Sequence, residues 1–411
     1  MAEPRVIELT EYAPCRLPPE ALSPREAGLI RASHEARISV VPLWDHEEGW
    51  ELTSQGYVGY LPVTPDLHLA MRPKVPLGNL FAMLEVAYEV GQFLREDSVQ
   101  VETLEELYER LAHVLARRVL DRVRRGLYRT YLGQHDATPY IRGRIDMARA
   151  SCAPWDPRLP CAYRDHTADV AENQILAWTL YTIARAPFCG ERARPAVRQA
   201  FRQLANRVSV EYQDPTCCRS VPYHRLNEDY RPLHILCRFF LEHSGPAHHR
   251  GDRAMIPFLI PMASLFETYV ARWLAAHPPP GCRVQDQRRL IWEPTLQRES
   301  RIDLVLSDER GNPLCVADTK YKDGAHIAEE DIHQIYFYAG AMGVREAVLI
   351  YPTSLAHPVN TSIGGVRVRS LSLDLAGDLE QASRRLAQEL AHIAERVRRS
   401  ALATAPTIKP N

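Results

Sequence analysis

The sequence predicts a multidomain α+β protein with a small β-rich N-terminal module, a mainly helical middle domain and a C-terminal α/β domain. The chain has 411 residues, more than one hydrophobic core usually supports. Its composition, 45% hydrophobic and 25% charged, is that of a globular protein. The hydrophobic pattern changes near residues 76 and 256. We therefore expect domains at residues 1–75, 76–255 and 256–411.

Short strands are predicted in the N-terminal module at residues 37–43, 56–61 and 67–71. These segments are rich in β-branched and aromatic residues and are broken by Gly and Pro turns. With little helix expected to cover them, we predict an exposed patch that binds a partner protein. The alternative is that these side chains pack as ordinary core on the middle domain. The side chains concerned are Trp44, Trp50, Tyr57, Tyr60 and Leu61.

Helical periodicity dominates from residue 80 to about residue 245. Apolar residues recur every three or four positions from Leu104 to Val119, and further helices are expected at 173–186, 193–208 and 230–243. The net charge of the chain is −1, so any affinity for nucleic acid must come from local patches. One such patch is the segment 117–129, with six arginines against Asp121. It is either a solvated helix face or a surface that binds nucleic acid.

The C-terminal domain has the pattern of an α/β unit. A helix at 262–276 precedes strands at 301–307, 313–321 and 346–351, and a second helix at about 331–342 lies between the last two strands. A last amphipathic helix begins near Leu379.

Two acids and a lysine in the first two of these strands carry the predicted chemistry. Asp303 interrupts an apolar strand, which is costly unless the acid binds a cation or lies at a rim. Asp318 and Lys320 end the next strand on one face, because side chains alternate, while Thr319 is expected to point away. The segment 307–312 has the composition of a hairpin turn, so the strands should pair and bring Asp303 beside Asp318.

Two carboxylates this close repel each other unless a divalent cation lies between them, and ligands that are all oxygen suit Mg²⁺. Such a metal polarises a phosphoryl oxygen and acidifies a water, which Lys320 would orient. Glu267, in the helix at 262–276, and Gln334, in the helix at 331–342, are further candidates, although each could instead cap or pack. This order of helix Glu, strand Asp, strand D-x-K and helix Gln predicts a PD-(D/E)xK restriction-endonuclease-like domain.

Several landmarks around these motifs resemble the McrC family, the nuclease subunit of McrBC-type restriction systems for modified cytosine. The resemblance runs from about residue 55 to residue 350. The matching stretches are residues 71–74, 80–84, 142–145, 169–176 and 261–267, together with the nuclease motifs.

The resemblance implies a type IV restriction-like endodeoxyribonuclease that cuts double-stranded, modified DNA. Members of this family act with a hexameric McrB-like AAA+ GTPase, insert their N-terminal region into its ring and stimulate its nucleotide hydrolysis. Asp303, Asp318 and Lys320 match the catalytic positions of the family, with both aspartates as Mg²⁺ ligands.

Two other functions remain open from the sequence. In the first, the chain is mainly an assembly and GTPase-activating subunit whose nuclease fold serves for docking. In the second, it is a stand-alone repair nuclease of the same fold. No G-x-x-x-x-G-K-[ST] segment occurs, so the chain is not expected to be the NTPase. Its nine cysteines show no C-x-x-C spacing, which argues against a zinc site. A cytoplasmic location without membrane contact is expected, because no signal sequence or apolar span is found.

Overall fold

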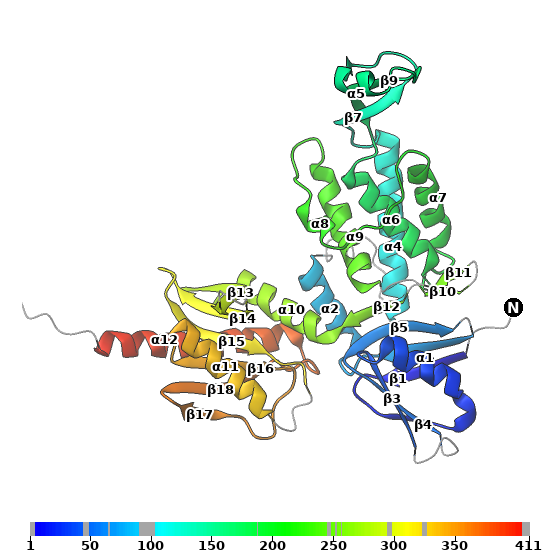
Figure 1. Ribbon diagram of the computed structural model, residues 1–411. Helices are drawn as coiled ribbons and strands as arrows, with labels where there is room; N and C mark the ends of the chain where they lie inside the picture. Colours follow the sequence, from blue (N-terminus) through cyan, green and yellow to red (C-terminus); the bar gives the residue numbers. More distant parts are fainter. Residues whose placement is uncertain are drawn as a thin grey trace, which may run out of the picture. The chain divides into compact units, whose positions relative to one another are not determined.

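The computed structural model describes residues 5–43, 49–64, 66–89, 103–186, 188–244, 248–250, 253–255, 257–293, 298–322 and 327–404 (Figure 1). The chain divides into two compact units: residues 1–91 together with 259–411 form unit 1, and residues 92–258 form unit 2. The predicted multidomain α+β class is confirmed. Residues 1–75 and 256–411, which were expected as separate domains, thus lie almost entirely in one unit.

The N-terminal part of unit 1 consists of two small sheets and a helix. One sheet has the strand order β1-β6-β5-β12 and the other the order β2-β4-β3. The predicted strands at 37–43, 56–61 and 67–71 correspond to β3, β5 and β6. The strands are β1 (Arg5–Thr10), β2 (Cys15–Leu17), β3 (Ile38–Pro42), β4 (Trp50–Ser54), β5 (Tyr57–Thr64), β6 (Leu67–Arg72) and β12 (Phe258–Pro261).

A helix that the sequence analysis did not predict, α1 (Pro24–His34), covers this module after the short η1 (Pro19–Ala21). Ser23 and Glu26 form a reciprocal capping box, and Pro24 occupies the first helical turn, where its missing N–H costs nothing. These residues are a typical sequence pattern for the start of a helix. The helix was not predicted from it because the segment as a whole has a β-rich composition. The buried side of α1 supplies Ala27 and Ile30 to the core.

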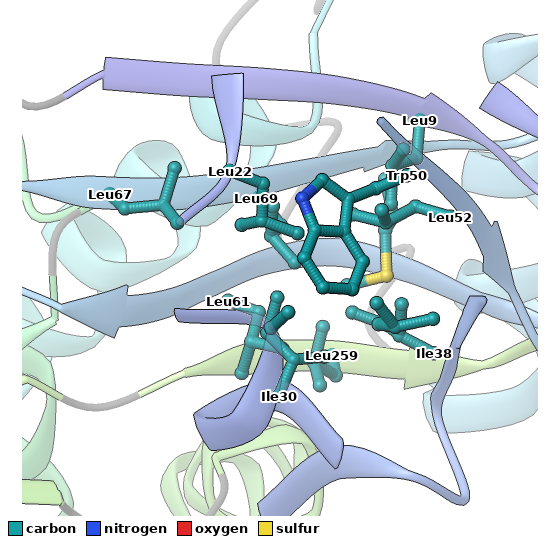
Figure 2. Close-up of a cluster of buried hydrophobic side chains, with 13 residues drawn as sticks. Leu9, Leu22, Ile30, Ile38, Trp50, Leu52, Leu61, Leu67, Leu69 and Leu259 are labelled. Carbon is teal, nitrogen blue, oxygen red and sulfur yellow. The ribbon is translucent and has the colours of Figure 1, made fainter. Parts of the chain in front are cut away.

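The prediction that the aromatic and apolar side chains of this module form an exposed patch is wrong for Trp50 and Leu61. Trp50 is 2% exposed and Leu61 is fully buried, both within a cluster of the module's own apolar side chains (Figure 2). Tyr57 and Tyr60 are half-buried, and Trp44 lies outside the described residues. The alternative was that these side chains pack on the helical middle domain. The cluster is instead completed by α1 and by Leu259 of β12. Leu259 is more than 200 residues from Trp50 in the sequence, so local patterns do not reveal the contact.

The C-terminal part of unit 1 is a six-stranded sheet with the order β13-β14-β15-β16-β18-β17. The pairs β15–β16 and β16–β18 are parallel, and the other pairs are antiparallel. The strands are β13 (Cys282–Glu293), β14 (Arg298–Asp308), β15 (Pro313–Thr319), β16 (Glu346–Tyr351), β17 (Asn360–Ile363) and β18 (Val366–Ser372).

Helices cover this sheet. In the view of Figure 1, α11 (Glu329–Met342) lies in front of the sheet and α12 (Leu379–Thr404) behind it. Ile335 and Ala339 of α11 pack with Val316 and Leu349, while α12 contributes Ala394 to a second apolar cluster. Helix α2 (Leu77–Tyr88) was assigned to the middle domain by its position in the sequence, but it packs on α10 (Met262–Ala276) within unit 1.

Unit 2 is a helical bundle with a small sheet at one end. The predicted helices are present, but β7 (Thr130–Thr138), β8 (Arg144–Ile145) and β9 (Leu159–Thr167) form a sheet where helix and loop were expected. We call residues 130–167, including α5 (Met147–Cys152), the tip sheet (Figure 1). Strand β7 has no buried residue, so it lacks the alternating apolar pattern that predicts a strand. The other elements are α4 (Leu104–Arg125), α6 (Ala171–Arg185), α7 (Arg194–Ala205), α8 (Cys217–Ser220), η2 (Glu228–Tyr230), α9 (Arg231–His243), β10 (His248–Arg250) and β11 (Arg253–Met255).

Candidate active site

The β14–β15 hairpin brings Asp303 and Asp318 to neighbouring positions. The strands pair antiparallel with Leu304 opposite Ala317, so the two aspartates follow at the next position of the register. The predicted turn forms at Asp308, whose carboxylate accepts the backbone N–H groups of Arg310 and Asn312. The predicted hairpin is confirmed, and it places both acids on paired strands within a buried sheet.

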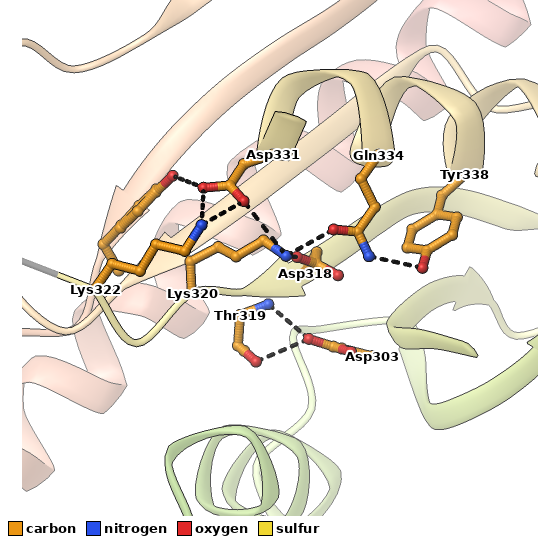
Figure 3. Close-up of polar contacts among 9 residues, drawn as sticks. Asp303, Asp318, Thr319, Lys320, Lys322, Asp331, Gln334 and Tyr338 are labelled. Atoms are coloured by element: carbon orange, nitrogen blue, oxygen red, sulfur yellow. Dashed lines mark hydrogen bonds and ion pairs between the residues drawn. The ribbon is translucent and has the colours of Figure 1, made fainter. Parts of the chain in front are cut away.

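Asp303 is held by the end of β15. Its Oδ2 atom accepts hydrogen bonds from the backbone N–H and from the hydroxyl of Thr319, both at 2.8 Å (Figure 3). The expectation that Thr319 points away from the site is therefore wrong. Thr319 is the last residue of β15, so its side chain is no longer fixed by the pleat of the strand. The two bonds fix one carboxylate oxygen of Asp303.

Asp318 and Lys320 form a buried ion pair. Asp318 is 2% exposed, and its Oδ2 atom lies 2.6 Å from Lys320 Nζ. Burial, followed by the charge of Asp303, raises the pKa of Asp318 to about 6, against the opposing effect of Lys320. Burial alone would lower the pKa of Lys320, but the surrounding carboxylates, Asp318 foremost, outweigh it and raise this pKa. Lys320 is thus held in its cationic form.

Gln334 of α11 orients the lysine. Lys320 Nζ donates to Gln334 Oε1 at 2.8 Å, and Gln334 Nε2 donates to the hydroxyl of Tyr338 at 2.9 Å (Figure 3). Gln334 and Tyr338 are one turn apart on α11 and present their side chains to the end of β15. The helix therefore fixes the position of the lysine ammonium.

Glu267 of α10 lies in the same site. Burial, followed by the charges of Asp303 and Asp318, raises the pKa of Glu267 to about 7. Its Oε1 atom accepts a hydrogen bond from the side chain of Gln287 in β13. Gln287 lies between Asp286, which pairs with Leu304, and Arg288, which pairs with Ile302, and it has φ +48°, a left-handed conformation that is unusual for a residue other than Gly. This backbone distortion beside three carboxylates is a feature of functional sites that the sequence does not reveal.

The structure thus brings all five predicted site residues together and adds a second ion pair beside them. Asp331 of α11 is 3% exposed and accepts two bonds from Lys322 Nζ, at 2.9 and 3.0 Å. The hydroxyl of Tyr351 donates to Asp331 at 3.4 Å, and Lys320 Nζ lies 3.7 Å from it. Lys322 was missed, although its spacing of two residues from Lys320 places both on one side of an extended chain.

The residue between the two lysines connects the site to the N-terminal module. The hydroxyl of Tyr321 donates to Glu11 Oε2 at 3.1 Å, and the ring of Tyr321 lies 5.8 Å from that of Phe266, the neighbour of Glu267. Glu11 is fully buried. The module therefore holds the segment that follows Lys320.

The donor set fits a hard divalent cation. Within the described ranges, no group of three or more His, Cys, Asp or Glu side chains has an arrangement that holds a metal. Mg²⁺ needs only one or two carboxylates because it keeps waters of its own, and Asp303 and Asp318 supply two. Burial first, and then the charge of the neighbouring carboxylates, raise the pKa values of Asp318 and Glu267, and a bound cation would favour their ionised forms.

Comparison with known proteins identifies the family. A family model for the McrBC 5-methylcytosine restriction system component matches residues 52–352. The type IV methyl-directed restriction enzyme EcoKMcrBC of Escherichia coli K12 is 22% identical over 189 residues, which are 46% of this chain and 54% of that protein. The chain thus spans about half the length of this curated relative.

A solved structure has a similar fold. It is a chain of the refined half-complex from a tetradecameric assembly of Thermococcus gammatolerans McrB AAA+ hexamers with bound McrC. The TM-score is 0.54 at 16% identity, covering 95% of this chain and 100% of that chain. Among the described residues, no helix is both long and apolar enough to cross a membrane.

Because the family model covers most of the chain, including every candidate site residue, the chain belongs to the McrBC 5-methylcytosine restriction system component family.

Proposed function

We propose that this chain is the Mg²⁺-dependent DNA endonuclease subunit of a McrBC-like restriction system, with its active site in a PD-(D/E)xK nuclease domain. The observation that carries this proposal is the set of buried Asp318 with half-buried Asp303 and Lys320 at the ends of two paired strands. Removing two like charges and a lysine largely from water is costly for stability, and such a cost is typical of sites that bind or transform a ligand. Membership of the restriction family supports the same reaction.

The residues divide the work of phosphodiester hydrolysis. Asp303 and Asp318 would hold the metal, and Glu267 would accept a bond from one of its waters. When bound, Mg²⁺ supplies the charge that polarises the scissile phosphate and acidifies the attacking water. An ammonium has three N–H donors; that of Lys320 donates to Gln334 and lies 2.6 Å from Asp318 Oδ2, which leaves one donor without either partner. The third is available to orient the water and to offset charge that develops on the phosphate.

A partner supplies the nucleotide hydrolysis that this chain lacks. The solved complex of similar fold consists of McrB AAA+ hexamers with bound McrC, and we extend that association to this chain. The partner would be a McrB-like AAA+ GTPase that recognises modified double-stranded DNA and whose hydrolysis this chain stimulates.

We infer that the tip sheet contacts this partner. Large apolar side chains stand exposed there, which a monomer rarely tolerates in one place unless they form an interface. Partner binding by residues 1–75 stays a prediction. An exposed aromatic patch no longer supports it, because Trp50 and Leu61 are buried. The most exposed large apolar side chains of the tip sheet are Tyr131 (64%), Tyr140 (63%), Ile141 (63%), Met147 (71%) and Trp155 (80%).

Asp318→Asn tests the nuclease assignment, because the change removes one charge and keeps the shape of the side chain. Modified duplex DNA is incubated with the wild-type or variant chain, the cognate AAA+ partner, GTP and Mg²⁺. We expect the wild type to cut and the variant to lose cutting while it still stimulates the GTPase.

Each other outcome assigns a different function. Cutting by Asp318→Asn at the wild-type rate would refute the site. Stimulation of the GTPase by a wild type that never cuts would show an assembly subunit. Cutting by the wild type without any partner would show a stand-alone nuclease.

A further inference from the structure

A cavity in unit 2 is lined mainly by residues of α4, four of which are arginines. It has a volume of about 640 Å³ and lies between α4 and the start of α9. Its charged lining includes Arg117, Arg118, Arg122, Arg125, Asp121 and Asp229. Four guanidinium groups face two carboxylates, so the lining carries a net positive charge. A concave surface of one sign concentrates its electrostatic field and attracts ligands of the opposite sign.

One of these arginines is fixed in place. Arg122 Nη1 donates to Asp229 at 2.7 Å, and its Nε atom donates to the hydroxyl of Tyr230 at 3.2 Å. The guanidinium lies 4.9 Å from the centre of the Tyr230 ring, and its side chain is 18% exposed. The cavity is therefore partly preorganised rather than lined by mobile side chains alone.

Two other arginines have unused binding capacity. Arg117 and Arg125 are exposed, and within the described part of unit 2 neither forms a hydrogen bond or an ion pair through its side chain. They lie eight residues apart on α4, about 12 Å at the helical rise of 1.5 Å per residue. Successive phosphates of one DNA strand advance about 3.4 Å, so the two arginines reach about three to four phosphate positions.

We propose that this cavity binds the phosphate backbone of a nucleic-acid strand. Arg122 supplies a fixed contact, and Arg117 and Arg125 supply contacts that only the ligand satisfies. Positive charge continues past the cavity at the exposed Arg129 and at the exposed Arg124, which pairs with Asp121 at 3.0 Å. A free nucleotide would fill the cavity alone, whereas a strand also uses these outer arginines, so the layout favours a polymer. The inference rests on the proposed function only in taking DNA as that strand.

The double variant Arg117→Gln/Arg125→Gln tests the site. Affinity of the full chain for a fluorescein-labelled duplex is measured by anisotropy in EDTA over a series of KCl concentrations, so that cleavage plays no part. Each lost phosphate contact reduces the slope of log K against log salt by about 0.9, so the slope should fall by about 2. Arg117→Lys/Arg125→Lys should restore it, because lysine also neutralises phosphate.

Arg384→Gln/Arg385→Gln on α12 is the matched control, since it removes two exposed charges that, among the described residues, bond to Glu380 and Gln381 on the same helix. This control should keep the wild-type slope. A wild-type slope in the cavity variant, or no salt-dependent binding by the wild type, would overturn the proposal.

Two competing ligands have their own readouts. Loss of tripolyphosphate binding with an unchanged duplex slope would assign the cavity to a free polyphosphate and overturn the proposal. Loss of GTPase stimulation with an unchanged duplex slope would assign the cavity to an acidic surface of a partner protein and would also overturn the proposal. The nuclease proposal fails by a different result: the wild-type chain does not cut DNA in the presence of its partner.

Discussion

Replacing Lys320 by Met is expected to reduce DNA cleavage by the reconstituted complex by a factor on the order of 10²–10³, as loss of a group that stabilises transition-state charge typically does. The ammonium joins Asp318, at 2.6 Å, to Gln334, at 2.8 Å. Methionine keeps the length and apolar stem of the side chain but removes the charge. Single-turnover cleavage at saturating partner measures the loss.

Lys322→Met is the control for this change. Lys322 is two residues further along, its side chain is 52% exposed, and it pairs with Asp331 rather than Asp318. We expect a small effect on cleavage, because its ammonium contacts neither Asp318 nor Gln334. Circular dichroism and urea unfolding check that both variants fold, since Lys320→Met leaves Asp318 buried without its partner. Equal losses of activity in the two variants would contradict a specific role for Lys320.

Combining Trp155→Ala with Tyr140→Ala is expected to abolish stimulation of the AAA+ partner without affecting the fold. Both side chains are largely exposed, so their removal leaves no cavity in the core. An interface hot spot contributes about 2 kcal/mol or more, and every 1.4 kcal/mol is tenfold in affinity, so each change should weaken association about 30-fold. Stimulated GTP hydrolysis as a function of chain concentration reports the loss.

Leu226→Ala is the matched control for the tip sheet. Leu226 is also in unit 2 and is 62% exposed, but it lies outside residues 130–167. It should leave the partner's affinity unchanged. Normal stimulation by the Trp155 and Tyr140 variant would show that the partner binds elsewhere.

The arrangement of the candidate site was predictable because its signals are local. The helix at 262–276 has the same bounds as α10, and the hairpin between Asp303 and Asp318 follows from two apolar strands joined by a short polar turn. Strand alternation places Asp318 and Lys320 together without knowledge of the rest of the fold.

The features that were missed depend on distant parts of the chain or on weak local patterns. Trp50 is buried because Leu259 and α1 close its core, and neither contact is visible in the segment around it. The strand β7 is exposed on both faces, so it carries no apolar alternation. The bond from Gln287 to Glu267 comes from a residue with a left-handed backbone, a conformation that no local sequence pattern predicts for glutamine.

Cleavage of a modified duplex as a function of Mg²⁺ concentration tests the central claim most directly. The reconstituted complex of the wild-type chain is compared with that of Asp303→Asn, in which one proposed ligand loses its charge while its bonds from Thr319 can persist. We predict saturable activation of the wild type by Mg²⁺ and no cleavage by Asp303→Asn at the concentration that saturates the wild type. Cleavage by Asp303→Asn at the same rate and with the same Mg²⁺ dependence would contradict the assignment of this site as the metal-dependent nuclease centre.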